Sequence, residues 1–185
     1  MRIEVKNIIQ KTLIILGLVI ILGSIYLKIY SKQIEKNAVD TFEKKIEEKI
    51  EAEEINIGDE IALINIPSIK LNAAIIHGTD NKYLKHHVCH FENSAMPGEN
   101  GNFAIAGHSS YRYNQVFNDI HKVNIGDIIK IKTINEEFTY KITKKFETNP
   151  DNIEVLNQDN YIKEITIVTC TNGGKDRLII KGLIE

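Results

Sequence analysis

Three side chains in the C-terminal half of the sequence could together perform nucleophilic chemistry on a carbonyl group. Cys170 ends the β-branched run 165–169, His108 follows the apolar segment 103–107, and Arg177 comes seven residues after the cysteine. In such a set the thiolate attacks, the imidazole moves protons, and the guanidinium stabilises charge on the oxygen of the intermediate. The run before Cys170 is typical of a strand, so we expect the thiol at a strand end, where it can face a cleft. The sequence therefore predicts a cysteine acyltransferase.

Each of these residues also has a simpler interpretation. Cys170 could be a buried core residue, or it could form a structural disulfide with Cys89, the other cysteine of the chain, if the protein is exported. His108 could cap a turn, and the five other histidines are rivals for its role. Arg177 could form a surface salt bridge, for example with Glu164. The residues by themselves leave these alternatives open.

The other metal-ligating and charged residues indicate neither a metal site nor nucleic-acid binding. His86, His87 and His90 lie close to Cys89, but the spacing lacks the second pair of ligands that zinc sites use. The formal net charge is −2, and the chain has no basic cluster that could neutralise a phosphate backbone. We therefore expect no metal, no cofactor and no nucleic-acid partner.

An uncharged apolar run near the N-terminus predicts a membrane anchor. The run covers residues 12–27, and the flanking Lys11 and Lys28 can reach the membrane surface, so the predicted span extends from about residue 8 to 30. A cleaved signal peptide is the alternative, but its apolar core is usually shorter and no small-x-small site follows this run. The flanking charges do not decide the orientation. We expect residues 1–30 to form a cytoplasmic tail and a single transmembrane signal anchor, with the catalytic domain extracellular.

A helical stalk or linker is predicted over residues 31–58. Residues 31–54 contain no Gly or Pro and are rich in Glu, Lys and Ala. On a helix with 3.6 residues per turn, an apolar stripe that recurs every four residues drifts around the axis. The stripe consists of Ile34, Ala38, Phe42, Ile46 and Ile50. The stalk could lift the following domain off the membrane, pack on it as an appendage, or be a partly frayed linker.

Residues 59–185 change to a pattern of short β segments. Strands are predicted at 61–66, 71–76, 102–106, 128–133, 138–146, 165–169 and 178–183, with a helical turn or two at 81–87. The short link Asn135-Glu136 makes 128–133 and 138–146 a hairpin, and the polar stretch 147–163 is long enough to be a functional loop. About eight short strands with few helices predict a mostly β fold, a closed eight-stranded β-barrel with short helices.

The residues around the candidate nucleophile resemble those of the sortases, the membrane-anchored cysteine transpeptidases of Gram-positive bacteria. The TLxTC signature of that family is present as Thr166-Ile167-Val168-Thr169-Cys170, with Ile in place of Leu. Ala106-Gly107-His108 matches the histidine after a buried strand, Arg177 matches the arginine on the last strand, and the turn at 97–102 is similar to the family's. The resemblance covers the whole architecture, from the anchor to the sortase-like catalytic barrel at 59–185.

The resemblance implies a two-step reaction on cell-surface proteins. Cys170 would attack the Thr–Gly carbonyl of an LPxTG-like sorting signal, and a thioacyl enzyme would form as His108 protonates the leaving glycine. An amine of a cell-wall precursor or of peptidoglycan would then attack, with His108 as base. Arg177 would hold the oxyanion or the substrate backbone. The residues expected to line the substrate groove are Thr169, Val168 and Ala104, with part of the 147–163 loop.

Among the sortase classes the chain is most similar to class D, with class A next. No lid with a DPG- or DPW-type motif precedes the domain, which argues against class C, and the 147–163 segment is too short for the long helix of class B. Glu92 and Glu99 alone do not make the acidic cluster that binds calcium in some class A members, which agrees with the expectation of no metal.

Two other functions remain open from the sequence. The chain could be a membrane-tethered β-barrel binding module without catalysis, in which Cys170 would be dispensable. It could also be a cysteine protease that only hydrolyses, which would release product without an amine acceptor.

Overall fold

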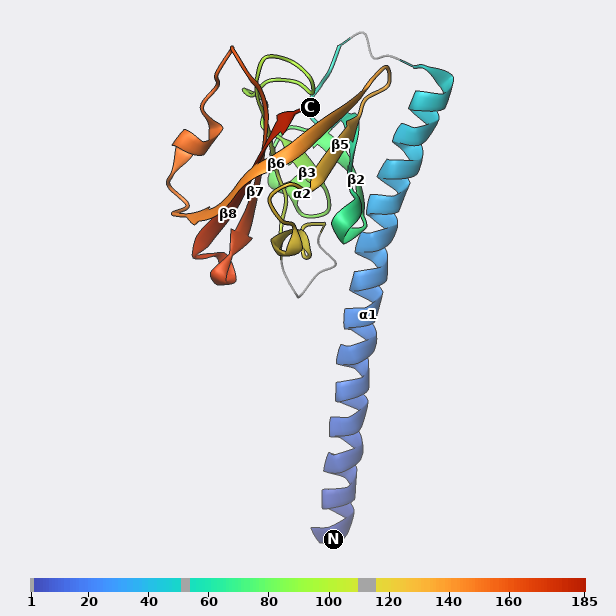
Figure 1. Ribbon diagram of the computed structural model, residues 1–185. Helices are drawn as coiled ribbons and strands as arrows, with labels where there is room; N and C mark the ends of the chain where they lie inside the picture. The colour runs from blue at the N-terminus through green and yellow to red at the C-terminus, as the bar shows by residue number, and fades with distance from the viewer. Residues whose placement is uncertain (1, 51–53, 110–115) are drawn as a thin grey trace.

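One long helix lies beside a closed eight-stranded β-barrel in the computed structural model, which describes residues 2–50, 54–109 and 116–185 (Figure 1). The helix is α1 (Arg2–Glu48). The strands are β1 (Glu60–Ile66), β2 (Leu71–His77), β3 (Val88–His90), β4 (Gly101–Ala106), β5 (Ile128–Lys132), β6 (Glu137–Thr148), β7 (Lys163–Thr171) and β8 (Asp176–Ile184). The barrel closes in the order β1-β2-β3-β4-β7-β8-β6-β5, with β2–β3 and β4–β7 parallel and the other pairs antiparallel. The predicted fold class is confirmed.

Short helical segments connect the strands at both ends of the barrel. They are α2 (Asn81–Leu84) and the 3₁₀ turns η1 (Pro67–Ile69), η2 (Ile120–Lys122), η3 (Ile153–Leu156) and η4 (Asn172–Gly174). The predicted hairpin is present as β5–β6, and the predicted helical turn at 81–87 is shorter, as α2. The stretch predicted as a long loop at 147–163 is reduced at both ends by β6 and β7, and it contains η3.

The strand that sequence patterning missed is β3. It has three residues, too few to show an alternation of polar and apolar side chains, and all three are buried. It forms because the edges of β2 and β4 on either side supply hydrogen-bonding partners; β3 runs parallel to β2 and antiparallel to β4. Its pairing completes the closed sheet between the two halves of the barrel, which a local pattern cannot indicate.

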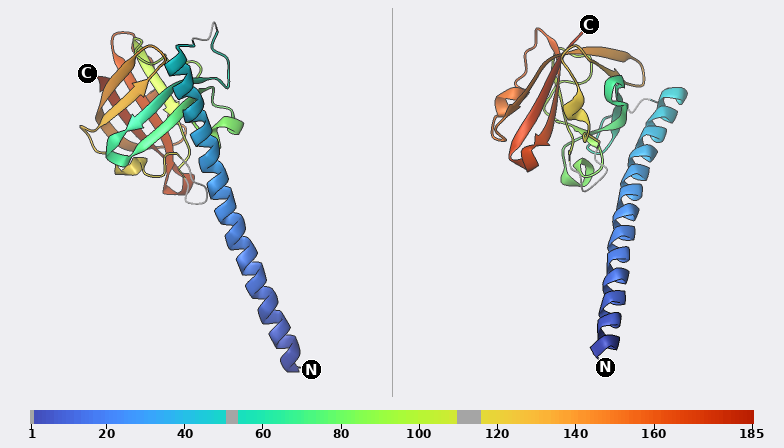
Figure 2. Two further views of the ribbon diagram at one scale, coloured as in Figure 1. Left: turned by 90° about the vertical axis from the view of Figure 1, so that its right-hand side faces the viewer. Right: turned by 60° about the horizontal axis from the view of Figure 1, so that its bottom comes forward.

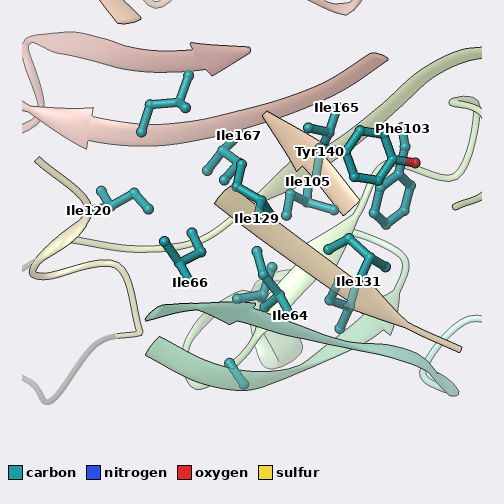
Figure 3. Packing of buried hydrophobic residues seen from close by; sticks show 14 of the residues in the cluster. Ile64, Ile66, Phe103, Ile105, Ile120, Ile129, Ile131, Tyr140, Ile165 and Ile167 are labelled. Atoms are coloured by element: carbon teal, nitrogen blue, oxygen red, sulfur yellow. The ribbon is translucent and has the colours of Figure 1, made fainter. Parts of the chain in front are cut away.

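The barrel interior is filled mainly by isoleucine side chains with a few aromatic rings (Figure 3). Alternate residues of each strand point inward, for example Phe103 and Ile105 on β4 and Ile165 and Ile167 on β7. The one polar tip in this view, the hydroxyl of Tyr140, accepts a hydrogen bond from the backbone N–H of Gly98 at 2.9 Å. Because the interior is packed, residues that do chemistry must lie on the outer face or at the barrel ends.

A separate small core joins α1 to the side of the barrel. Ala38, Val39 and Phe42 of α1 are buried against Leu63 of β1 and Ala74 of β2. Phe42 is 0% exposed, so it loses all contact with water at this junction. Figures 1 and 2 show α1 lying along the barrel and then continuing well beyond it toward the N-terminus.

Polar contacts surround this junction at both of its ends. The carboxylate of Glu35 accepts hydrogen bonds from the backbone N–H of Ala74 at 2.9 Å and from Nδ1 of His87 at 2.7 Å. Nearer the C-terminal end of α1, Lys45 donates to Glu60 at 2.7 Å. The contacting residues recur with helical spacing and form one straight face, so the helix docks along its side rather than at a single point.

The predicted apolar stripe of the stalk is therefore only partly correct. Its last member, Ile50, is 51% exposed, and α1 ends before it, at Glu48. Lys49 has a φ of 50°, a left-handed conformation that stops the helix. The stalk was expected to be helical to residue 54, but residues 51–53 lie outside the described part of the chain. Polar members of the contact face, such as Glu35, were not recognisable from an apolar pattern.

The part of α1 from residue 9 to residue 30 is almost entirely exposed and strongly apolar. From Ile9 onward the helix contains a stretch with a mean hydropathy of 2.4 and none of it buried. By length and composition α1 can cross a membrane. The helix continues without a break from this stretch into the segment that docks on the barrel.

The histidine and cysteine cluster around β3 has a structural arrangement. Nε2 of His90 donates to the carbonyl of Ala95 at 3.1 Å, so its Nδ1 accepts from Nδ1 of His77 at 3.0 Å. Burial raises the pKa of Cys89 to about 12 and lowers the pKa of His90 to about 4. Both cysteines are free, so the alternative of a Cys89–Cys170 disulfide is wrong. Within the described residues no three His, Cys, Asp or Glu side chains are grouped to hold a metal ion.

Replacing Phe42 by alanine should undock α1 while the barrel stays folded. Loss of a buried phenylalanine typically costs about 3–5 kcal/mol, and the main barrel core contains no residue of α1. We expect faster amide hydrogen exchange over residues 31–48 of the full chain in detergent, with little change in β4 and β7. Glu47→Ala, at an exposed position of the same helix, is the control. Unchanged exchange in Phe42→Ala would show that the junction does not hold the helix.

His90 should make the barrel less stable in mild acid. Its pKa is about 4 in the folded protein, against an ordinary value of 6.5 for histidine, because burial disfavours the charged imidazolium. The contribution of neutral His90 to the free energy of unfolding is about 3 kcal/mol; it is fully present above pH 6.5 and is lost as the pH falls toward 4. Denaturant unfolding at several pH values should show this slope, and His90→Gln should flatten it. His121→Gln, an exposed histidine, should keep the wild-type slope.

Candidate active site

The candidate nucleophile lies at the exit of β7, on the outer face of the barrel. Ile165 and Ile167 point into the core, so the alternate residues Val168 and Cys170 face outward and are half-buried. Cys170 lines a cleft of about 810 Å³. The cleft is bounded by residues from three places in the chain: Ser109, Asn118, Ile120, His121, 169–174 and Leu178. A free, half-buried thiol in an open cleft can be reached by a substrate.

Arg177 is directly opposite Cys170 in the antiparallel β7–β8 pair. Opposed residues of such a pair project from the same face, with Cβ atoms about 4.5–5.5 Å apart. Nη1 of Arg177 donates to the carbonyls of Gly174 at 3.1 Å and of Asp176 at 3.2 Å. A guanidinium has five N–H donors, so these two bonds orient the group and leave capacity for a substrate oxygen. The sheet register therefore brings together two of the predicted residues.

The η4 turn reverses the chain between β7 and β8, so that Cys170 and Arg177 can lie opposite each other. Asn172, Gly173 and Gly174 have φ values of 50°, 68° and 91°, which belong to the left-handed region. Glycine adopts this region without steric cost, so the Gly173-Gly174 pair allows the chain to reverse tightly between β7 and β8. The carbonyl of Gly174 then reaches Arg177.

His108 follows β4, the strand parallel to β7. The paired register ends with Ala106 opposite Val168, and the N–H of Gly107 still donates to the Val168 carbonyl at 3.2 Å. Continued by two residues, this register brings the backbone of His108 level with Cys170. His108 is half-buried. The third predicted residue therefore lies at the same end of the barrel as the other two.

The chain on either side of His108 is held by specific contacts. The hydroxyl of Thr169 donates to the carbonyl of Gly107 at 2.7 Å, and the N–H of Phe117 donates to the carbonyl of His108 at 3.2 Å. A Cβ atom at position 107 would lie 2.5 Å from the ring of Phe117, so only glycine allows this ring to pack there. Sequence reasoning did not identify Gly107 or Phe117 as supports, although a glycine directly before a candidate base was a usable signal.

A second histidine, His121 of η2, lines the same cleft as Cys170. It is exposed, and its Nδ1 donates to the carbonyl of Asn118 at 2.9 Å, which leaves Nε2 as the other nitrogen. The remaining four histidines are engaged elsewhere, His77 and His90 with each other and His86 and His87 with α1. The number of rivals for the role of base is therefore reduced to one.

The three predicted groove residues differ in their access to solvent. Thr169 borders the cleft, but it is 3% exposed and its hydroxyl is used by Gly107. Val168 is half-buried on the outer face. Ala104 is 0% exposed, so nothing in this structure supports its contact with a substrate. Asn102, two residues before Ala104, donates to the carbonyl of Val155, which shows that the β6–β7 connection covers this part of the outer face.

The site as a whole combines a cleft lined by the thiol of Cys170 and the imidazole of His121 with two flanking groups, the oriented guanidinium of Arg177 and the imidazole of His108. A thiol that attacks a carbonyl, a histidine that carries protons and donors for the oxyanion are the requirements of covalent acyl transfer. The alternative in which Arg177 forms a surface salt bridge with Glu164 is not found, because Glu164 forms its ion pair with Lys181.

Comparison with known proteins places this geometry in one family. The sortase-domain family model matches residues 64–185. Sortase A of Bacillus anthracis is 31% identical over 112 residues, which are 60% of this chain and 52% of that protein. Sortase D of Bacillus subtilis is 28% identical over 135 residues, 73% of this chain and 64% of that protein. The chain thus spans about half to two thirds of the length of these relatives.

Solved structures give the same result. A sortase D5 transpeptidase of Clostridium perfringens is 46% identical to this chain, with a TM-score of 0.76. The match covers 83% of this chain and 99% of the other. Sortase C of Clostridium perfringens, solved with the C-terminal cell wall sorting motif, is 25% identical with a TM-score of 0.66, covering 80% of this chain and 86% of the other. With the family domain matched over most of the chain, this protein belongs to the sortase family of cysteine transpeptidases.

Proposed function

We propose that this protein is a membrane-anchored transpeptidase that cleaves an LPxTG-like sorting signal between Thr and Gly and joins the product to a cell-wall amine. The observation that carries the proposal is the register pair Cys170–Arg177 in a sortase barrel, in which Cys170 lines a cleft. This pair puts a nucleophile and a donor for its oxyanion on one face of two adjacent strands. No separate substrate-binding domain is required for this chemistry.

The first half of the reaction would use all three residues. The thiol of Cys170 gives its proton to His108, Sγ forms a bond with the threonine carbonyl carbon, and charge moves to the carbonyl oxygen, where Arg177 donates hydrogen bonds. The Thr–Gly bond then breaks, and His108 gives a proton to the leaving amine of glycine. A thioester between the substrate threonine and Cys170 remains. The carbonyls of Gly174 in η4 and of Asp176 at the start of β8 hold the guanidinium of Arg177 in place for this step.

The second half would reverse these roles. An amine of a cell-wall precursor or of peptidoglycan attacks the thioester carbon, and His108 accepts its proton. The C–S bond breaks, and the thiol of Cys170 is restored. The openness of the cleft on the outer face supports this step, because an acceptor must enter while the acyl group is still attached.

The proposed location is the outer surface of a cell membrane, with α1 as a single-pass anchor. The exposed apolar stretch of α1 supports this location. The 46% identity to a sortase D5 transpeptidase supports class D over class A. The sorting signals of surface proteins and a cell-wall amine are the proposed partners.

The full chain should convert an LPxTG-type peptide into an amine-ligated product, and Cys170→Ala should abolish this conversion. Mass spectrometry of reactions with and without triglycine would follow the cleaved peptide, the ligated peptide and the thioacyl adduct. Cleavage without ligation at any amine concentration would instead indicate a hydrolase. No adduct and no cleavage across a library of sorting motifs would indicate a binding module.

The same assay can identify the histidine that carries protons, because two histidines lie near the cleft. His108→Ala should lower kcat by about 100-fold or more, which is typical for loss of a general acid–base. His121→Ala, at an exposed position on the other wall, should change kcat by less than about threefold, as expected for a residue outside the chemistry. The opposite ranking would transfer the role to His121.

Thr169→Val should lower kcat more than it changes KM, and Thr169→Ser should restore most of the activity. Valine keeps the shape of threonine but leaves the carbonyl of Gly107 without its donor, at a cost of about 1–3 kcal/mol for a bond that is 2.7 Å long. The segment before His108 would then be less well placed. An equal loss in the serine variant would show that the methyl group, rather than the hydroxyl, is important.

A further inference from the structure

We infer that docking of α1 turns the cleft of Cys170 toward the membrane that α1 enters, so that this end of the barrel faces the lipid surface and acts on substrates held in the same bilayer. The inference rests on the proposed membrane anchoring and deepens the proposed function. It concerns the direction in which the site points, which neither the family match nor the catalytic residues decide.

The two ends of the barrel can be assigned relative to α1 from its contacts. Toward its N-terminus, Ser31 is hydrogen-bonded to His86 at 3.3 Å, and His86 comes just before the start of β3. Toward its C-terminus, Ile46 packs against the small core at the junction, and so does Ile134, which lies in the turn between β5 and β6. Residue 46 of α1 therefore lies near the β5–β6 turn, and residue 31, closer to the N-terminus, lies near the beginning of β3.

The cleft lies at the end of the barrel that α1 reaches first. Strand β3 is antiparallel to β4, so its start at Val88 is at the same end as the finish of β4 at Ala106. Strand β4 is parallel to β7, so this is also the end that carries Cys170. Figure 1 shows the η4 turn and the N-terminal part of α1 extending toward the same side, at the bottom of the view.

A groove between α1 and the barrel confirms this assignment independently. It is lined on the helix by residues between Lys32 and Glu43 and on the barrel by residues 69–72 and by Val116, Asn118 and Asp119. Asn118 also lines the cleft of Cys170. The cleft and the membrane-proximal part of the docked helix are therefore neighbours. The β5–β6 turn and Pro97 lie against the other end of α1, near Phe42 and Ile50.

The barrel begins where the proposed membrane span ends. The ring of Tyr30 lies edge-on to the ring of His86 with centroids 6.5 Å apart, and Tyr26 stacks on Tyr30 at 6.2 Å. Tyrosines are favoured at the membrane–water interface. Because an α-helix rises only about 1.5 Å per residue, a barrel that contacts residues 30 and 31 leaves room for little more than headgroups between its near end and the hydrocarbon.

Charges at this end of the barrel are compatible with a lipid surface. Exposed lysines occur in four of its connections, Lys70 after η1, Lys85 before β3, Lys122 in η2 and Lys175 after η4. Of the acidic groups at this end, Asp119 is paired with Lys122 at 2.8 Å, which offsets the charge of that lysine. Asp176 accepts a hydrogen bond from Asn172 at 3.0 Å, and the exposed Glu147 accepts one from Thr171 at 3.2 Å. Each lysine near an anionic membrane contributes about 1 kcal/mol of attraction. The occupant of this face is therefore the bilayer itself.

A distance measurement on the full chain in lipid nanodiscs tests the orientation without any catalysis. Single cysteines are introduced at Lys122→Cys, near the cleft, and at Glu136→Cys, in the β5–β6 turn, in a Cys170→Ala background. Cys89 stays unlabelled because it is buried and its pKa is raised to about 12. Energy transfer from a fluorophore at each site to an acceptor lipid should be clearly stronger at 122 than at 136. Equal transfer, or stronger transfer at 136, would overturn the inference.

A dock-breaking variant shows whether α1 causes the orientation. Glu35→Gln combined with Phe42→Ala removes the buried ring and the paired carboxylate, and it should reduce the difference between the two probes. Glu47→Gln, at an exposed position of α1, should keep the difference. A difference that survives in the dock-breaking variant would mean that something other than α1 orients the barrel.

An insertion tests the consequence for substrates. Seven alanines placed between Tyr30 and Ser31 leave the contacts of residues 31–46 with the barrel in place. They move the barrel about 10 Å further from the proposed membrane span and rotate it by only about 20° about the helix axis. Turnover of a lipid-anchored LPxTG-type peptide with a short linker should fall about tenfold, through loss of effective concentration. Turnover of the soluble peptide should not change. Equal effects on both peptides would contradict the inference, whereas no turnover of either by the unmodified chain would refute the proposed function and leave the probe result to decide the orientation.

Discussion

The pairing of β7 with β8 is the constraint on which the rest of this site depends. It fixes Cys170 opposite Arg177 and, two residues further in, Val168 opposite Ile179. A shift of one residue would turn Cys170 into the core and Ile167 outward, because side chains alternate across a sheet. The filled barrel interior resists such a shift, since it would bury a reactive thiol and expose several isoleucines. The packing of the core therefore determines the chemistry on the outer face.

The third catalytic candidate is added by a different kind of contact. His108 lies beyond the last paired residue of β4, where no ladder of hydrogen bonds can hold it. The hydroxyl of Thr169 and the backbone of Phe117 hold the neighbouring peptide groups instead. A residue of the signature motif thus has a structural function toward the strand next to it. Glycine is needed at position 107, between a core strand and a candidate base, because a Cβ there would lie 2.5 Å from the ring of Phe117.

The docked helix gives the barrel a direction. Under the proposed membrane anchoring, a barrel that did not dock on α1 would be free to present either end to the membrane. The buried ring of Phe42 and the shared carboxylate of Glu35 replace that freedom with one orientation. The helix continues without a break from its apolar part into the segment that docks on the barrel, so the direction of the apolar part fixes the direction of the barrel. If α1 spans a membrane as proposed, the stability of this small junction determines which end of the barrel faces the lipid.

The sequence by itself determined the local features of this protein. The β-branched runs predicted most strands, the apolar run predicted a helix able to cross a membrane, and the motif ending at Cys170 indicated the family, because each depends on neighbouring residues. The three residues of β3 could not be predicted, because that strand exists only through the hydrogen-bonding edges of β2 and β4.

The role of Glu35, the supports of His108 and the position of His121 in the cleft were also decided only by the tertiary structure. All of these depend on contacts between segments that lie far apart in the chain. Composition and periodicity indicate which side chains a segment exposes on each face. Which other segment packs against that face is determined only when the barrel closes.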